Sequence, residues 1–234
     1  MAEVFDHTIY ESPLSWRYGS EEMKEIFSEV HKRKLLRRVW IALARAEAKA
    51  GIVRMDQVEE LEEHKDEVDI AKASEIESLI HHDLMAEIKT YASQCPKAGG
   101  IIHMGATSMD ALDNADAVRF SEALDLTLSR LDDLISALSE KAEEHKATAT
   151  MAFTHIQPAE VTTIGYRLSQ TIQDLLDDRE QLLFVRRNIR GEGMKGAVGT
   201  AASYTEPLEG TGISAMAMEE MVMEELGIKA YDAA

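Results

Sequence analysis

One apolar stripe, which runs from about residue 110 to residue 145, constrains the fold of this sequence more than any other feature. Its side chains recur at alternating spacings of four and three residues: Leu124, Leu128, Leu131, Ile135, Leu138 and Ala142. This spacing places them on one face of a helix about 50 Å long, at about 1.5 Å per residue. Long helices with a narrow apolar stripe usually pack in bundles, often across subunits, so a bundle is predicted.

The rest of the sequence also favours helices. A second long helix is predicted from about Val161 to Arg190, with an apolar side formed by Ile164, Leu168, Ile172 and Leu175. Shorter helices are predicted over residues 24–30, 34–51, 55–68, 73–92 and 208–227. Ser20 is expected to cap a helix and Gly51 to end one. Because the chain has only four prolines and no alternating strand pattern competes, the predicted fold class is all-α.

The segment PKAGG at residues 96–100 breaks a helix just before the long stripe begins. We therefore predict an N-terminal helical domain over residues 1–107 and a central long-helix bundle domain over residues 108–234. The last residues, KAYDAA, follow a helix without a pattern that would complete the bundle. The bundle domain is accordingly expected to be incomplete at its C-terminal end.

Composition argues against several classes of protein. The chain has 43 acidic and 25 basic residues, and its net charge of −18 repels nucleic acid. No run of about 18 apolar residues is present that could span a membrane. The first residues, MAEVFDHTIYES, lack the pattern of a secretory leader. Cys95 is the only cysteine, so an internal disulfide is impossible and a cytoplasmic location is expected.

The segment GEGMKG at residues 191–196 matches the dinucleotide-binding pattern G-x-G-x-x-G. That pattern binds a pyrophosphate where it follows a strand and opens a helix. Here it follows a long predicted helix, and no alternation of strands and helices is present. We therefore interpret it as a sharp glycine-rich turn, in which Lys195 remains a candidate for contact with an anion.

Polar side chains gather at two other places. Thr107 and Ser108 precede the long helix, where hydroxyl groups cap the helix or, together with its free N–H groups, bind an anion such as a carboxylate. Thr154 and His155 lie in MAFTHIQPAEVTT, and an imidazole in partly apolar surroundings suits proton transfer near neutral pH. His103 is interpreted as a buried histidine with satisfied hydrogen bonds.

A metal site is not expected. His81 and His82 are adjacent, and adjacent side chains on a helix point about 100° apart, so the pair cannot chelate one ion as i,i+4 histidines do. The sequence contains no H-E-x-x-H motif and no cysteine cluster.

Four segments, taken in order, resemble the adenylosuccinate lyase family of the fumarase/aspartase superfamily. They are WRYGSEEMKEIFSE, HHDLMAEIKTYASQCPKAGGIIHMGATSMDALDN, MAFTHIQPAEVTTIGYR and RGEGMKGAVGTAASY. The resemblance covers essentially the whole chain. It implies elimination of fumarate from adenylosuccinate, giving AMP, and from the succinyl-carboxamide imidazole ribotide of purine biosynthesis. It also implies no cofactor, and a homotetramer in which three subunits build each active site.

The resemblance implies roles for individual residues. His155 matches the general acid that protonates the departing nitrogen, and His82 matches a second histidine that orients substrate or supports the first. Thr107 and Ser108 match the hydroxyls that bind the succinyl carboxylates.

Arg17 and Tyr18 match the pair that meets the nucleotide phosphate; on composition alone they would be a surface pair. The remaining candidates for substrate binding are His81, Asp83, Thr154 and Lys195.

Two departures from the family pattern matter. His81 stands where the family usually has arginine, which weakens one anion contact or makes it depend on pH. The family's G-S-S-x-M-P-x-K-x-N loop, which carries the serine taken to be the general base, is absent, and so is a Gln-Thr segment that helps to hold substrate. The 234-residue chain is therefore predicted to be inactive or nearly so.

Two alternatives remain open. Within the superfamily, the nearest competitors are argininosuccinate lyase and carboxymuconate cycloisomerase, and the Arg17–Tyr18 start argues against both. From a different class, the chain could be a non-catalytic helical oligomerisation module, because apolar stripes in a bundle require no chemistry.

Overall fold

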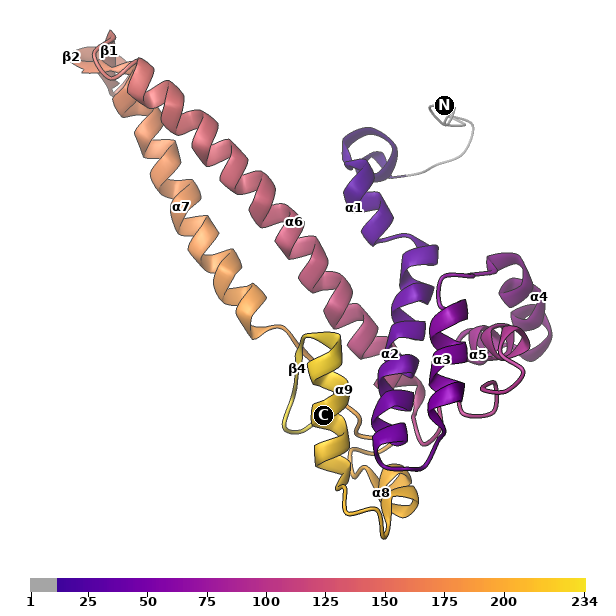
Figure 1. The fold of residues 1–234 in the computed structure, drawn as a ribbon. Coiled ribbons are helices and arrows are strands. Elements are labelled where there is room, and N and C mark those ends of the chain that lie inside the picture. The colour runs from indigo at the N-terminus through magenta and orange to yellow at the C-terminus, as the bar shows by residue number, and fades with distance from the viewer. Residues whose placement is uncertain (1–11) are drawn as a thin grey trace. The chain divides into compact units, whose positions relative to one another are not determined.

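In the computed structural model, which describes residues 12–234, the chain divides into two compact units (Figure 1). The first unit contains the chain up to Phe120 together with Ile189–Ala234, and the second contains Ser121–Asn188. Residues 1–11, which hold most of the segment used to argue against a secretory leader, lie outside the described residues. The domain division at residues 107 and 108 stays a prediction.

The described part of the first unit is mainly helical. Its elements are η1 (Leu14–Tyr18, a π-helix), α1 (Glu21–Ile26), α2 (Glu29–Lys49), α3 (Met55–His64), α4 (Ile70–Ile80), α5 (Asp83–Gln94), the start of α6 (Ser108–Glu144), β3 (Arg190–Gly191), α8 (Ala202–Leu208), α9 (Ala215–Leu226) and β4 (Lys229–Ala230). The helix α2 packs against α3 and α9 (Figure 1). The short strands β3 and β4 pair in parallel.

Side chains of α2 form the centre of the first unit. Trp40 is 1% exposed, and both Leu61 of α3 and Val222 of α9 are fully buried against the same core. Burying an apolar side chain of this size contributes roughly 1.5–3 kcal/mol. The core also holds a charged pair, in which Arg37 Nε lies 2.9 Å from Glu87 Oε1 and neither side chain is more than 1% exposed.

The second unit is a helical hairpin. It contains the remainder of α6, the strands β1 (Ala149–Thr154) and β2 (Gln157–Thr163), and α7 (Ile164–Asn188). The two helices run in opposite directions and are joined by the antiparallel strands (Figure 1). Most side chains of the predicted stripes are half-buried, and Leu128 is 8% exposed. The helices are also linked by Arg179 Nε to Asp132 Oδ1 at 2.6 Å.

The predicted all-α fold class is confirmed, and so are both long helices and the cap at Ser20, whose Oγ accepts a hydrogen bond from Met23 N at 3.2 Å. The expectation that no strand interrupts the helices is wrong. Residues 149–154 pair with residues 157–163, so α7 begins at Ile164 rather than Val161. The hairpin turn consists of His155 and Ile156, with φ of 48° and 63°.

Several of the shorter predicted helices have other bounds in the structure. The helix predicted over residues 24–30 is interrupted at Phe27 and Ser28, and the one predicted over residues 55–68 ends at His64. The helix predicted over residues 73–92 is interrupted at His81, which has φ 55° and ends α4, while His82 caps α5. The helix predicted over residues 208–227 forms only from Ala215, because Ser214 is its N-cap and Gly210 and Gly212 both have positive φ. None of the helices between residues 12 and 234 has the length and apolar character needed to cross a membrane.

Candidate active site

The turn at the start of α6 carries the two hydroxyl groups singled out in the sequence. Thr107 directly precedes the helix and Ser108 is its first residue; both are half-buried. Within residues 12–234, neither hydroxyl makes a hydrogen bond, so both are available to a ligand. A helix N-terminus with free N–H groups and hydroxyls favours a carboxylate at this position.

Asp110 fixes the backbone of this turn. Its side chain is fully buried, and its Oδ2 accepts hydrogen bonds from Thr107 N at 2.9 Å and from the Tyr204 hydroxyl at 2.7 Å. Its Oδ1 accepts from Lys195 N at 3.0 Å and Gly196 N at 3.1 Å. One carboxylate thus joins the start of α6 to a loop about 85 residues later in the chain.

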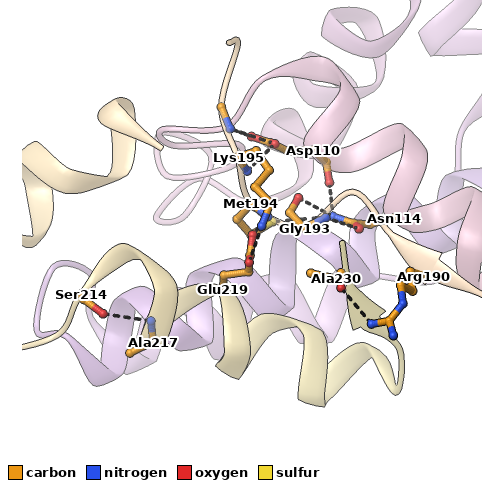
Figure 2. Close-up of polar contacts among 11 residues, drawn as sticks. Asp110, Asn114, Arg190, Gly193, Met194, Lys195, Ser214, Ala217, Glu219 and Ala230 are labelled. Carbon is orange, nitrogen blue, oxygen red and sulfur yellow. Dashed lines mark hydrogen bonds and ion pairs between the residues drawn. The ribbon is translucent and has the colours of Figure 1, made fainter. Parts of the chain in front are cut away.

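The loop 193–196 uses its backbone N–H groups on the protein's own side chains (Figure 2). Gly193 N donates to Asn114 Oδ1 at 3.1 Å, and Met194 N donates to Glu219 Oε2 at 2.7 Å. The next two N–H groups donate to Asp110. No N–H group of this loop is therefore left to cradle a phosphate, and the G-x-G-x-x-G match is not a dinucleotide site.

The glycines of this segment are required by close packing. A Cβ on Gly191 would lie 2.0 Å from Asn114 Oδ1, and one on Gly193, whose φ is +91°, would lie 2.3 Å from Glu219 Oε2. These glycines therefore allow the backbone to approach protein carboxylate and amide groups rather than a pyrophosphate.

Lys195 is paired within the protein. Its Nζ lies 2.7 Å from Glu219 Oε1, and the two side chains are 11% and 13% exposed. Binding of a substrate anion by Lys195 stays a prediction, and it requires the ammonium group to leave Glu219 or to be shared with it.

His81 and His82 lie between α4 and α5, and Asp83 is the first residue of α5, so the three do not lie within one helix as the sequence predicted. His82 Nδ1 accepts a hydrogen bond from Met85 N at 3.2 Å, so the neutral imidazole carries its proton on Nε2. The side chains of His82 and Asp83 are 49% and 62% exposed. Within residues 12–234, no three His, Cys, Asp or Glu side chains are arranged to hold a metal ion.

His103, which the sequence analysis interpreted as buried, is half-buried in the structure. Its Nδ1 accepts a hydrogen bond from Trp40 Nε1 at 3.0 Å. Burial lowers the pKa of His103, the nearby Asp110 carboxylate raises it, and the charge of His82 lowers it. The pKa of His103 is thus lowered overall, chiefly by burial.

The other candidates lie elsewhere. Arg17 and Tyr18 are exposed on η1, where the Arg17 guanidinium carbon lies 5.4 Å from the centre of the Tyr18 ring. Thr154 and His155 belong to the second unit, where both are exposed at the β1–β2 turn. His82, Thr107 and Ser108 belong to the first unit, as Arg17 and Tyr18 do, and their convergence on one substrate stays a prediction.

Sequence reasoning did not single out Asp110, Tyr204 or Glu219 as supports of the site. Asp110 and Glu219 accept hydrogen bonds from backbone N–H groups of a distant loop, and Tyr204 donates its hydroxyl to Asp110. No motif in the sequence marks these pairings. The available signal was the acidic residue three positions after Thr107, a spacing typical of a capping box.

Comparison with known proteins gives a consistent result. A family model described as Lyase matches residues 16–230. The chain is 38% identical over 226 residues to an adenylosuccinate lyase of Saccharomyces cerevisiae, covering 95% of this chain and 47% of that protein. It is 39% identical to an adenylosuccinate lyase of Schistosoma mansoni, covering 94% and 46%. The chain thus spans about half the length of the curated relatives it matches.

Solved structures share the fold. A 3-carboxy-cis,cis-muconate lactonizing enzyme from Pseudomonas putida aligns with a TM-score of 0.80 and 27% identity, covering 92% of this chain and 48% of that one. A fumarate lyase from Mesorhizobium sp. BNC1 aligns with the same TM-score at 22% identity, covering 92% and 50%, and supports the fold alone.

Proposed function

The chain belongs to the lyase family whose model matches residues 16–230, and from this membership we propose that the whole protein eliminates fumarate from adenylosuccinate. The observation that carries the proposal is the 38% identity with the yeast adenylosuccinate lyase along 95% of this chain. The products are AMP and fumarate, and the same site also cleaves the succinyl-carboxamide imidazole ribotide.

The reaction needs a base, an acid and a binding site for developing charge. The base removes a proton from the carbon beside a carboxylate, and the electron pair spreads into that carboxylate. The C–N bond then breaks, and the acid protonates the departing nitrogen. Fixed hydrogen-bond donors around the carboxylate stabilise this transition state more than the ground state.

The proposed roles follow the chemistry of each side chain. His155 is the general acid, and His82 orients the substrate, with its Nδ1 accepting from Met85 N and its Nε2 without a partner among residues 12–234. Thr107 and Ser108 bind a succinyl carboxylate, because their hydroxyls are unengaged within residues 12–234 and stand at a helix N-terminus.

The nucleotide phosphate is proposed to meet Arg17 and Tyr18, which are exposed on η1. The further proposed contacts with the substrate come from His81, Asp83, Thr154 and Lys195. Because Thr154 and His155 are exposed in this structure, we propose that they act in a homotetramer in which several subunits build each site.

We propose that the activity belongs to the longer protein and that it acts in the cytoplasm. The relatives are about twice as long as the matched segment, and the 234-residue chain lacks the serine-bearing loop. Cys95, the only cysteine, is a buried free thiol, and a chain without an internal disulfide suits a reducing compartment.

The test is a fumarate-release assay, followed by ultraviolet absorbance, on the full-length protein and on residues 1–234. The full-length protein should cleave adenylosuccinate, and the short chain should show little or no turnover. His155→Gln in the full-length protein should lower kcat roughly a hundredfold or more. Full turnover by residues 1–234 would contradict the proposed need for the longer protein.

A second candidate function is cycloisomerisation of a carboxymuconate, which the 27% identity with the Pseudomonas putida enzyme favours. A substrate panel of adenylosuccinate, argininosuccinate and carboxymuconate decides between the enzymes. A non-catalytic oligomerisation module predicts turnover of none of them, and no shift of His82 or His155 resonances when AMP is added.

A further inference from the structure

We propose that Asp110 is a positioning residue, which holds the Thr107–Ser108 turn against the loop 193–196 so that the two hydroxyls keep one geometry toward the substrate carboxylate. This inference rests on the proposed function. It assigns a role to a carboxylate that does not itself face the substrate.

The hydrogen bonds of Asp110 require a carboxylate. Its side chain is fully buried, and its two oxygens receive three backbone N–H groups and one hydroxyl, from Thr107, Lys195, Gly196 and Tyr204. A carboxylate accepts on both oxygens, whereas an amide accepts on one only and presents N–H groups on the other side. Asparagine at this position would place two donors against each other.

Tyr204 completes the arrangement from α8. Its hydroxyl donates to Asp110 Oδ2 at 2.7 Å, and burial together with Asp110 raises the pKa of this hydroxyl, so it stays protonated as a donor. A Cβ added to Gly105 would lie 3.0 Å from the Tyr204 ring, so the ring packs closely on the segment that leads into Thr107. Ser203 Oγ also donates to Gly105 O, at 2.6 Å.

These contacts fix the turn on two sides. Thr107 N is held by the same carboxylate oxygen that receives Tyr204, while the other oxygen is bound by the loop. A misplacement of about 1 Å in a group that binds the reacting carboxylate costs roughly a hundredfold in rate. Loss of Asp110 should therefore act on the chemical step through Thr107 and Ser108.

The matched control is Tyr91, another buried tyrosine of the first unit. Its hydroxyl donates to Leu61 O at 2.5 Å and has no contact with Asp110 among the described residues. Tyr204→Phe and Tyr91→Phe each remove one buried hydroxyl, and only the first of them removes a donor to Asp110.

The experiment uses the full-length protein with steady-state kinetics on adenylosuccinate and hydrogen exchange by mass spectrometry. Asp110→Asn should lower kcat at least tenfold with a smaller change in KM, and Tyr204→Phe should lower kcat at least threefold. Tyr91→Phe should leave kcat within twofold of the parent. In Asp110→Asn, hydrogen exchange should be at least tenfold faster than in the parent in the peptides that contain Thr107 and Lys195–Gly196. Exchange in α2 should be the same in both proteins.

Three outcomes would overturn the inference: an Asp110→Asn protein with kcat within twofold of the parent, equal losses of kcat in the two tyrosine variants, or unchanged exchange in both peptides. If Asp110→Asn does not fold, the comparison of the two tyrosine variants decides. If the parent does not cleave adenylosuccinate, the proposed function fails, and exchange still decides whether Asp110 holds the turn to the loop.

Discussion

Glu47 of α2 is buried without full hydrogen bonding. Its side chain is 3% exposed, and its Oε2 has no partner among the described residues. Burial raises the pKa of Glu47 from 4.5 to about 8, so the folded protein holds this proton at neutral pH while the unfolded chain releases it.

Glu47 should therefore make stability depend on pH. Because folded Glu47 binds a proton that the unfolded chain releases, its protonation contributes to the free energy of unfolding in full below about pH 4.5. That contribution is lost as the pH rises to about 8. The slope of the free energy of unfolding against pH that Glu47 causes is at most about 1.4 kcal/mol per pH unit. Denaturant unfolding between pH 5 and pH 8 should show that Glu47→Gln reduces this slope.

The exposed Glu59 of α3 provides the control, since Glu59→Gln makes the same chemical change in solvent. It should leave the pH dependence of unfolding as in the parent. Parallel curves for the parent and Glu47→Gln would show that Glu47 is ionised in the folded protein.

Gly191 tests the close packing under the glycine-rich loop. Gly191→Ala would place a Cβ 2.0 Å from Asn114 Oδ1 and should destabilise the protein by roughly 1–3 kcal/mol. Gly100→Ala meets nothing within 4 Å and should change the free energy of unfolding by no more than about 0.5 kcal/mol. Equal effects of the two changes in thermal unfolding would contradict the packing argument.

At the scale of elements, the end of α4 carries backbone strain. His81 occupies the left-handed region, with φ 55° and ψ 39°, and its N–H donates to Glu77 O at 2.7 Å. Glycine adopts this conformation without a Cβ penalty, so His81→Gly should stabilise the protein by up to about 1 kcal/mol. Thermal unfolding should show a higher midpoint.

The control is His81→Ala, which removes the same imidazole and keeps the Cβ. It should give no gain in stability. If alanine and glycine stabilise equally, the imidazole rather than the backbone conformation is the source of the strain.

The sequence predicted long helices better than their interruptions. The periodic stripes of α6 and α7 mark a face that each helix buries, and such a pattern is local. The break at His81 and the turn at His155–Ile156 occur at residues with positive φ that are not glycine. Turn patterns expect glycine or asparagine there, so no local signal marked either break.

The candidate site could be predicted in part for the same reason. Thr107 and Ser108 stand at a predicted helix start, and the structure places them there. The pairing of Lys195 with Glu219 and three of the four donors to Asp110 join segments about 25 to 95 residues apart. No local pattern in a single sequence reveals such pairings.

At the scale of the whole molecule, the two units bury their apolar side chains to different extents. The helices of the first unit share a core of fully buried side chains that includes Trp40, Leu61 and Val222. Among the apolar side chains of the second unit, Leu128 alone is buried, while Phe184 is 67% exposed. The apolar surface left on the second unit gives self-association a physical driving force.

Native-state hydrogen exchange should separate the units in residues 1–234 at low protein concentration. Local opening needs less free energy where fewer apolar contacts are lost, so amides of α7 should exchange at least tenfold faster than those of α2. If copies associate through α6 and α7, protection of α7 should rise with protein concentration, because association favours the folded state by mass action. Protection of α2 is the internal control, since its side chains are already buried within one chain. Equal protection of α7 and α2 at every concentration would show that the second unit is stable without partners, and the proposed homotetramer would then lose this support.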